Sequence, residues 1–166
     1  MFVKRINRKA HRALCSIAAQ WIQPNDDVLE CDWGTGLLSQ AMAGRCRSLT
    51  DADFAPKMPR KGRKTVRLFP SIVFCQADIT VLDSADSCFD EVAAGNAIHL
   101  LGDPMKALLE LNRACKTDGL LIIPTCMNCD RKGRISYSAT AVGRTGADFK
   151  CKFTVGTCRG SECRIQ

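Results

Sequence analysis

Five short apolar segments at intervals along this 166-residue chain constrain its fold more than any other feature. They are residues 28–31, 48–52, 72–76, 89–95 and 120–123. Each is too short for a helix, and several are separated by stretches with apolar residues at helical spacing, such as residues 37–43. Strands that are apolar on both faces and alternate with helices are typical of a parallel sheet covered on two sides. The sequence therefore predicts an α/β fold, a three-layer sandwich built on a mainly parallel sheet.

Two further helices are predicted, one at the N-terminus and one before the fifth strand. The apolar face of the N-terminal helix is expected to comprise Ile6, Ala10, Ala13, Leu14, Ile17 and Trp21. Asp103 is suited to cap a helix that begins at Pro104, and Gly119 is a plausible C-terminal cap. The apolar face of this second helix is expected to comprise Met105, Leu108, Leu111 and Cys115.

The net charge of +7 is distributed in blocks. Residues 1–24 carry five basic side chains and no acidic one, and residues 54–76 carry six and none. A basic surface attracts nucleic acid, but the second block has no interleaved aromatic residue, so we expect no nucleic-acid partner. The longest uncharged stretch is 13 residues, which is too short for a membrane span, so we expect no membrane partner.

The eleven cysteines are odd in number and scattered, which is unlike a disulfide framework. We interpret them as small core residues in a reducing, cytoplasmic environment. Cys126 and Cys129 form a pair that zinc sites use, but its partner pair, Cys158 and Cys163, is loosely spaced. No metal site is predicted.

Polar residues follow four of the predicted strands directly. The first strand leads through Glu30 into a turn with Gly34 and Gly36, and the next strands are followed by Asp53, Asp78 and Asn96. In parallel sheets, ligands bind beyond the carboxyl ends of the strands. We therefore expect these side chains to line one ligand site.

Stretches 28–36, 48–58, 73–80, 89–101 and 103–124 together resemble the class I S-adenosylmethionine-dependent methyltransferases, of the ubiquinone/menaquinone type. The resemblance covers about residues 25 to 125. It implies a Rossmann-like sheet with strand order 3-2-1-4-5 and S-adenosylmethionine as the cofactor. The positions that it implies for cofactor binding are Glu30, Asp32, Gly34, Thr35, Gly36, Asp53, Phe54, Ala77, Asp78, Ile79 and Asn96.

The charge around the glycine turn favours this cofactor over a dinucleotide. Glu30 and Asp32 would repel a pyrophosphate but suit a ligand that carries a sulfonium and an ammonium group. The third glycine position of the dinucleotide fingerprint is occupied by Ser39. Asp32 also departs from the methyltransferase pattern, which has a small residue there.

The end of the chain departs further from the family. We expect a methyltransferase core over residues 1–124, including an N-terminal helix in residues 1–24, and a basic, cysteine-containing segment over residues 125–166. The usual C-terminal strand hairpin is expected to be missing or incomplete, as in a truncated chain. Residues 120–123 would then form an exposed sheet edge, through which a homodimer is expected.

The sequence is compatible with two functions. One is an active methyltransferase with a small-molecule acceptor that the sequence does not identify, in which His99 is the candidate proton acceptor. The other is an inactive remnant that binds the cofactor and serves in binding or assembly. An RNA methyltransferase is disfavoured, because Asn96 to His99 lack the signature of amino-methylating nucleic-acid enzymes.

Overall fold

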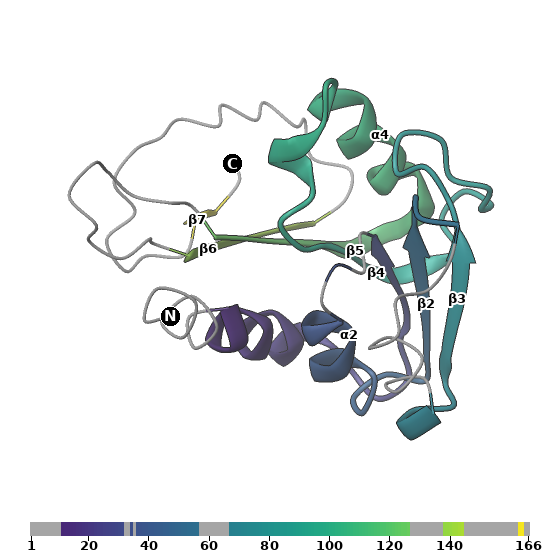
Figure 1. The fold of residues 1–166 in the computed structure, drawn as a ribbon, viewed down its shortest axis with the longest axis vertical. Coiled ribbons are helices and arrows are strands. Elements are labelled where there is room, and N and C mark those ends of the chain that lie inside the picture. Colours follow the sequence, from purple (N-terminus) through teal and green to yellow (C-terminus); the bar gives the residue numbers. More distant parts are fainter. Residues whose placement is uncertain are drawn as a thin grey trace.

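The structure is a computed structural model, and it describes residues 11–31, 34, 36–56, 67–126, 138–144 and 163–164. Seven strands form one sheet in the order β3-β2-β1-β4-β5-β6-β7 (Figure 1). Their bounds are β1 Asp27–Cys31, β2 Ser48–Asp53, β3 Ile72–Gln76, β4 Phe89–Ala94, β5 Cys115–Cys126, β6 Ser138–Arg144 and β7 Cys163–Arg164. The first five strands pair in parallel, which confirms the predicted order 3-2-1-4-5.

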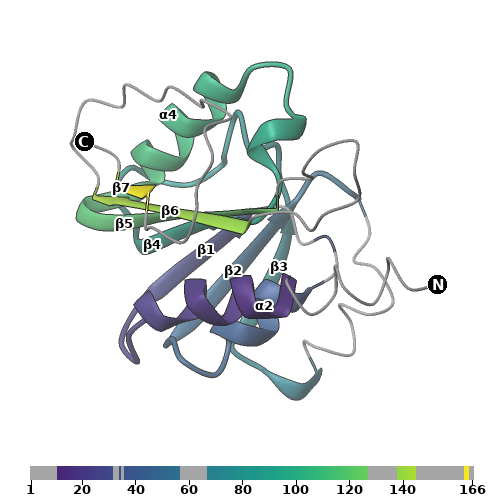
Figure 2. The ribbon, with the colours of Figure 1, turned by 90° about the vertical axis from the view of Figure 1, so that its left-hand side faces the viewer.

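Helices cover both faces of this sheet, as the three-layer prediction requires. Their bounds are residues 11–18 for the N-terminal helix, then η1 Ala19–Trp21, α2 Leu37–Met42, η2 Ile98–Leu100 and α4 Pro104–Ala114. The N-terminal helix and α2 lie on one face, and α4 lies on the other (Figures 1 and 2). Within the described residues, no helix meets the length and hydropathy needed to span a bilayer.

The alternation of side chains along β1 shows why the strands are apolar on both faces. Leu29 packs in a buried cluster with Leu108 and Leu111 of α4. Its neighbour Val28 packs in the opposite cluster, with Met42 of α2. Successive strand residues point to opposite faces, so a strand between two helical layers needs apolar residues at consecutive positions.

The N-terminal helix is confirmed over residues 11–18, but the part of its predicted apolar face that the structure describes is wrong. Ile6 and Ala10 lie outside the described residues. Leu14 is buried as expected, whereas Ile17 is 48% exposed and Trp21 is 40% exposed. The helix instead turns Cys15 and Ala18 to the sheet. The small Ala18 side chain is fully buried, so the helix can lie close to the strands beneath it.

The start of α4 is confirmed, and its end is not where the sequence suggested. The Asp103 carboxylate accepts a hydrogen bond from the Lys106 backbone N–H (3.0 Å) and caps the helix. The helix ends at Ala114, and Gly119 lies inside β5. A Cβ atom at Gly119 would lie 2.5 Å from the carbonyl oxygen of Asp90, so the close approach of β4 explains this glycine better than a helix cap does. Met105, which was placed on the apolar face, is 42% exposed.

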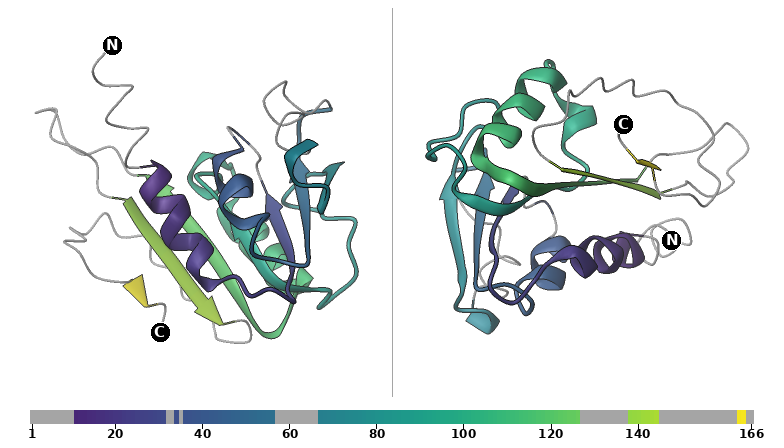
Figure 3. Two further views of the ribbon diagram at one scale, coloured as in Figure 1. Left: turned by 90° about the horizontal axis from the view of Figure 1, so that it is seen from below. Right: turned by 180° about the vertical axis from the view of Figure 1, so that it is seen from behind.

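The prediction that residues 120–123 form an exposed edge is wrong. Strand β6 pairs with β5 in antiparallel orientation, from Leu120 opposite Arg144 to Cys126 opposite Ser138. Strand β7 then pairs with β6 over two residues, and Figure 3 shows the N-terminal helix running alongside β6. Because its backbone groups are paired, β5 gives no basis for a homodimer through that edge. The strand suggested at residues 149–155 lies outside the described residues.

Candidate functional site

The carboxyl ends of β1, β2, β3 and β4 meet at one edge of the sheet. Cys31, the last residue of β1, is in register with Ala52 of β2 and with Ala94 of β4. Asp53 at the end of β2 is in register with Gln76 at the end of β3. The polar residues that follow these strands therefore start from neighbouring positions, as the sequence predicted.

The turn after β1 depends on its two glycines. Gly34 and Gly36 have φ angles of 47° and 68°, in the left-handed region that residues with a Cβ atom rarely adopt. Gly36 is the residue before α2, so the chain passes from the strand into the helix within a few residues. The other residues predicted here, Asp32 and Thr35, lie outside the described residues.

A cavity of about 360 Å³ opens beyond the ends of β2 and β3. It is lined by Ala52, Asp53, Phe54, Ala77, Asp78, Ile79, Thr80, Ala97, Leu100, Leu101, Gly102 and Asp103. Five predicted cofactor-binding residues are in this set: Asp53, Phe54, Ala77, Asp78 and Ile79. The structure thus places the two predicted acids, 25 positions apart in the chain, in one cavity.

Backbone hydrogen bonds hold both acids in place. An oxygen of Asp53, Oδ1, accepts a hydrogen bond from the Ala55 N–H (2.7 Å). Asp78 Oδ1 accepts one from the backbone N–H of Thr80 and one from its hydroxyl, both at 2.8 Å. These two bonds hold the pKa of Asp78 below its usual value. Asp78 is therefore a carboxylate at neutral pH.

The walls of the cavity are apolar between these acids. Ala77, Ile79 and Leu101 pack against the α4-side core, which fixes their positions. Phe54 and Leu100 line the same cavity and are exposed by 76% and 72%, so they present apolar surface to a ligand. A flat apolar ligand with polar groups at its ends matches this combination.

Glu30 occupies a different environment from these residues. It is 1% exposed, and it does not line the cavity. Its register partner on β2 is Asp51, which is fully buried and accepts a hydrogen bond from the Ser39 hydroxyl (3.1 Å). Two buried acids thus lie side by side under α2, close to the glycine turn. Sequence reasoning missed Asp51 because it sits within an apolar strand segment.

Asn96 follows β4 and is held in the left-handed region, with φ of 59°. Its backbone N–H donates to the carbonyl of Pro124 (2.9 Å). Its side-chain amide nitrogen lies 3.2 Å from Nε2 of His11 on the N-terminal helix. His11 is not among the residues that the sequence predicted for the site. His99 lies in η2, next to Leu100 of the cavity.

The described cysteines include six free thiols, at positions 15, 31, 46, 75, 88 and 115. Burial raises the pKa of Cys115 to about 12, so its thiol stays protonated and unreactive. Three of the six, Cys15, Cys31 and Cys115, are core residues. Among the residues that the structure describes, no group of three or more metal-ligating side chains comes together. Cys129, Cys151 and Cys158 lie outside them.

Comparison with protein families finds a match between residues 29–123 and the family described as "Methyltransferase domain". The ubiquinone/menaquinone biosynthesis C-methyltransferase of Bdellovibrio bacteriovorus is 35% identical over 102 residues, or 59% of this chain. A phosphatidylethanolamine N-methyltransferase of Cereibacter sphaeroides is 31% identical over 120 residues, or 70% of this chain. The matched regions span 43% and 58% of those two proteins.

Among solved structures, the fold is similar to that of phosphoethanolamine N-methyltransferase 1 of Haemonchus contortus, with a TM-score of 0.65. That structure is a complex with phosphoethanolamine and S-adenosylhomocysteine. The two chains are 19% identical, and the match covers 77% of this chain and 28% of the other. This likeness concerns the fold.

Proposed function

This chain belongs to the methyltransferase-domain family, and on that premise we propose that it transfers the methyl group of S-adenosylmethionine to a small-molecule acceptor. The observation that carries the proposal is the cavity at the ends of β2 and β3, in which Asp53 and Asp78 stand at polar positions around apolar walls.

The residues of this cavity fit the adenosine part of the cofactor. The Asp53 carboxylate can accept hydrogen bonds from ribose hydroxyls, and Asp78 can accept one from an exocyclic amino group. Phe54 and Ile79 offer apolar surface for a flat base. All charged residues that line the cavity are acids, so a phosphate group would be repelled there.

The turn at Gly34 and Gly36 fits the methionine part. Without Cβ atoms, these residues let the backbone approach a ligand closely. Glu30 and Asp51 lie under the helix that follows this turn and make its surroundings unfavourable for a pyrophosphate. A ligand with ammonium and sulfonium groups suits the same surroundings.

When bound, S-adenosylmethionine supplies an activated methyl group, so the work of the protein is to bind and align. Alignment of the acceptor with that methyl group can lower the activation barrier by on the order of 7–11 kcal/mol in ideal cases. Asn96 is suited to this task, because its strained backbone is anchored to Pro124 and its amide is held against His11.

For the acceptor we propose an aromatic ring of the quinone type. The name of the Bdellovibrio relative, a ubiquinone/menaquinone biosynthesis C-methyltransferase, suggests this class. The exposed Leu100, which lines the cavity and is not assigned to the base of the cofactor, supports an apolar acceptor next to the cofactor. Transfer of a methyl group to a ring carbon releases one proton, and a nearby histidine can accept it. The chain has two histidines, and the fold brings the backbone of both to this end of the sheet. We assign the proton-accepting role to His99, because His11 is engaged by Asn96.

The cofactor assignment is tested by the affinity for S-adenosylhomocysteine, the product of methyl transfer. We expect D53N to weaken binding by about 10- to 100-fold, the value of one or two hydrogen bonds to a charged group. D83N is the matched control, because Asp83 is an exposed acid of the adjacent loop and does not line the cavity. Equal affinities of D53N and D83N would refute the placement of the ribose.

The acceptor is tested separately, by transfer of a tritiated methyl group from S-adenosylmethionine to reduced demethylmenaquinone. Incorporation that is lost in H99Q, with unchanged S-adenosylhomocysteine affinity, supports both the acceptor class and the base. Cofactor binding without transfer to any offered acceptor would favour the alternative of a cofactor-binding module without activity.

A further inference from the structure

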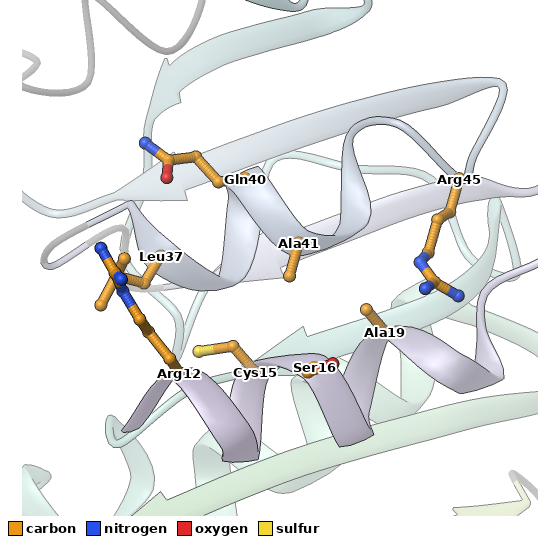
Figure 4. A pocket seen from close by; sticks show the side chains of 8 residues that line it. All are labelled: Arg12, Cys15, Ser16, Ala19, Leu37, Gln40, Ala41 and Arg45. Carbon is orange, nitrogen blue, oxygen red and sulfur yellow. The ribbon is translucent and has the colours of Figure 1, made fainter. Parts of the chain in front are cut away.

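A second cavity, outside the proposed cofactor site, lies between the N-terminal helix and α2 (Figure 4). Its volume is about 310 Å³. It is lined by Arg12, Cys15, Ser16, Ala19, Leu37, Gln40, Ala41 and Arg45, and it shares no residue with the cavity of Asp53 and Asp78. We refer to it as the arginine groove.

The two helices that form the arginine groove are firmly held. Cys15 of the N-terminal helix and Ala19 of η1 are 3% and 1% exposed, so this side of the groove is part of the core. On the other side, Leu38 and Met42 anchor α2 in the same buried cluster. The groove is therefore a fixed feature of this face of the sheet, built on rigid elements.

The charge of the groove is positive and unbalanced. Its two charged residues are both arginines, and no acidic side chain lines it. In Figure 4, Arg12 extends from the N-terminal helix at one end of the groove and Arg45 reaches in from the α2 side at the other end. An anion bound between them would meet a guanidinium at either end.

Three other cations of the described chain, Arg47, Arg113 and Lys116, have acidic partners. Arg47 pairs with Asp27, and Arg113 pairs with Glu110. For Arg12 and Arg45, no carboxylate lies within ion-pair distance among the residues that the structure describes. Two arginines whose charge is not neutralised by such a pair, facing one groove, are what an anionic ligand requires.

We propose that the arginine groove binds a phosphate monoester on a compact apolar body. Guanidinium groups bind phosphate through paired N–H donors, and the hydroxyl group of Ser16 adds a neutral donor in the groove. Leu37, Ala41 and Ala19 supply an apolar surface for the rest of the ligand. The phosphate belongs either to a soluble monoester or to the headgroup of phosphatidic acid, because both present a phosphate monoester.

The groove also borders the proposed cofactor site through one element. Leu37, Gln40 and Ala41 belong to α2, which begins directly after the glycine turn. The binding of phosphate in the groove does not depend on the proposed methyl transfer, and its test does not use the cofactor.

The test uses two probes on the full chain at physiological ionic strength. Phenyl phosphate, measured by titration calorimetry, represents the soluble ester, and sedimentation with vesicles of phosphatidic acid and phosphatidylcholine represents the headgroup. We expect R12Q and R45Q each to weaken binding of the effective probe at least tenfold. A41F fills the groove without a change of charge and should also abolish binding.

R47Q is the control, because Arg47 is an exposed arginine that pairs with Asp27 outside the groove. It should leave the affinity within twofold of wild type. Binding of phenyl phosphate alone identifies a soluble ligand, and binding of vesicles alone identifies a lipid headgroup. Either result supports the proposal if the variants R12Q, R45Q and A41F no longer bind that probe. The proposal is overturned if neither probe binds, or if R47Q loses as much affinity as R12Q, which would indicate general attraction to a basic surface.

Discussion

Replacement of Glu91 by glutamine should remove most of the pH dependence of stability between pH 5 and pH 8. Glu91 lies in β4 and is 6% exposed, and within the described structure its Oε2 has no hydrogen-bond partner. Burial raises the pKa of Glu91 to about 8, and the neighbouring acids Asp26 and Asp90 add to the rise. In the folded protein this carboxyl group is therefore protonated at neutral pH.

The magnitude follows from the two protonation states. In the unfolded chain Glu91 has an ordinary pKa of 4.5 and is ionised over this range, whereas the folded protein keeps the proton up to about pH 8. A group with a raised folded pKa contributes its full stability below the unfolded pKa and loses it as pH rises through the folded pKa. The loss is about 1.4 kcal/mol per pH unit, and over the whole window it is on the order of 5 kcal/mol.

The assay is urea unfolding at pH 5.5, 6.5, 7.5 and 8.5, with the free energy of unfolding extrapolated to water. E91Q, which has no ionisable group at this position, should lack the decline and become more stable than wild type at the highest pH. E110Q is the control, because Arg113 holds the pKa of Glu110 below its usual value. The contribution of Glu110 to the free energy of unfolding is complete above pH 4.5 and is lost only at lower pH. Between pH 5.5 and 8.5 the free energy of unfolding of E110Q should therefore change with pH as that of the wild type does. Parallel curves for wild type and E91Q would refute the reasoning.

Three further substitutions test the packing. G119A should destabilise the protein by about 1–3 kcal/mol or more, because its Cβ would lie 2.5 Å from the Asp90 carbonyl oxygen; a melting temperature equal to wild type would contradict this close approach. L108A removes a side chain that is 1% exposed and should cost about 2–5 kcal/mol in urea unfolding, while L109A, at a 61% exposed position, should cost much less. R113M should lower the free energy of unfolding by about 1–3 kcal/mol, because the Arg113 guanidinium donates hydrogen bonds to Glu110 and to the carbonyls of Ser84 and Leu82. If 1 M salt lowers the stability of the wild type by the same amount, only screened surface charge is involved and this reasoning is wrong.

The parallel core was predictable because its signals are local and strong. Segments such as residues 28–31 and 120–123 are apolar on both faces, and only a sheet covered on two sides buries them. The cap at Asp103 and Pro104 was equally clear, since that pair of residues has a specific role at a helix start.

The errors arose where tertiary contacts decide the structure. Ile17 and Trp21 repeat at helical spacing and yet face outward, because the small Ala18 and Ala19 let the opposite side of the helix approach the sheet. Gly119 resembled a helix cap, but the approach of β4 requires it. Strand β6 was missed because its sequence, SATAVGR, has small and polar residues that give a weak strand signal.

The candidate site was predicted in part for a similar reason. Asp53 and Asp78 follow strand ends, and the topology of a parallel sheet places such residues together. The contact between His11 and Asn96 joins residues 85 positions apart and depends on how the N-terminal helix docks. Its sequence signal is a single histidine on a basic helix, which does not specify a partner.

The most direct measurement of the central claim is calorimetric titration of the full chain with S-adenosylhomocysteine and, in a parallel experiment, with NAD. The cavity acids Asp53 and Asp78 predict saturable binding of S-adenosylhomocysteine and no binding of NAD, whose pyrophosphate they would repel. Saturable heat with NAD and none with S-adenosylhomocysteine would contradict the account.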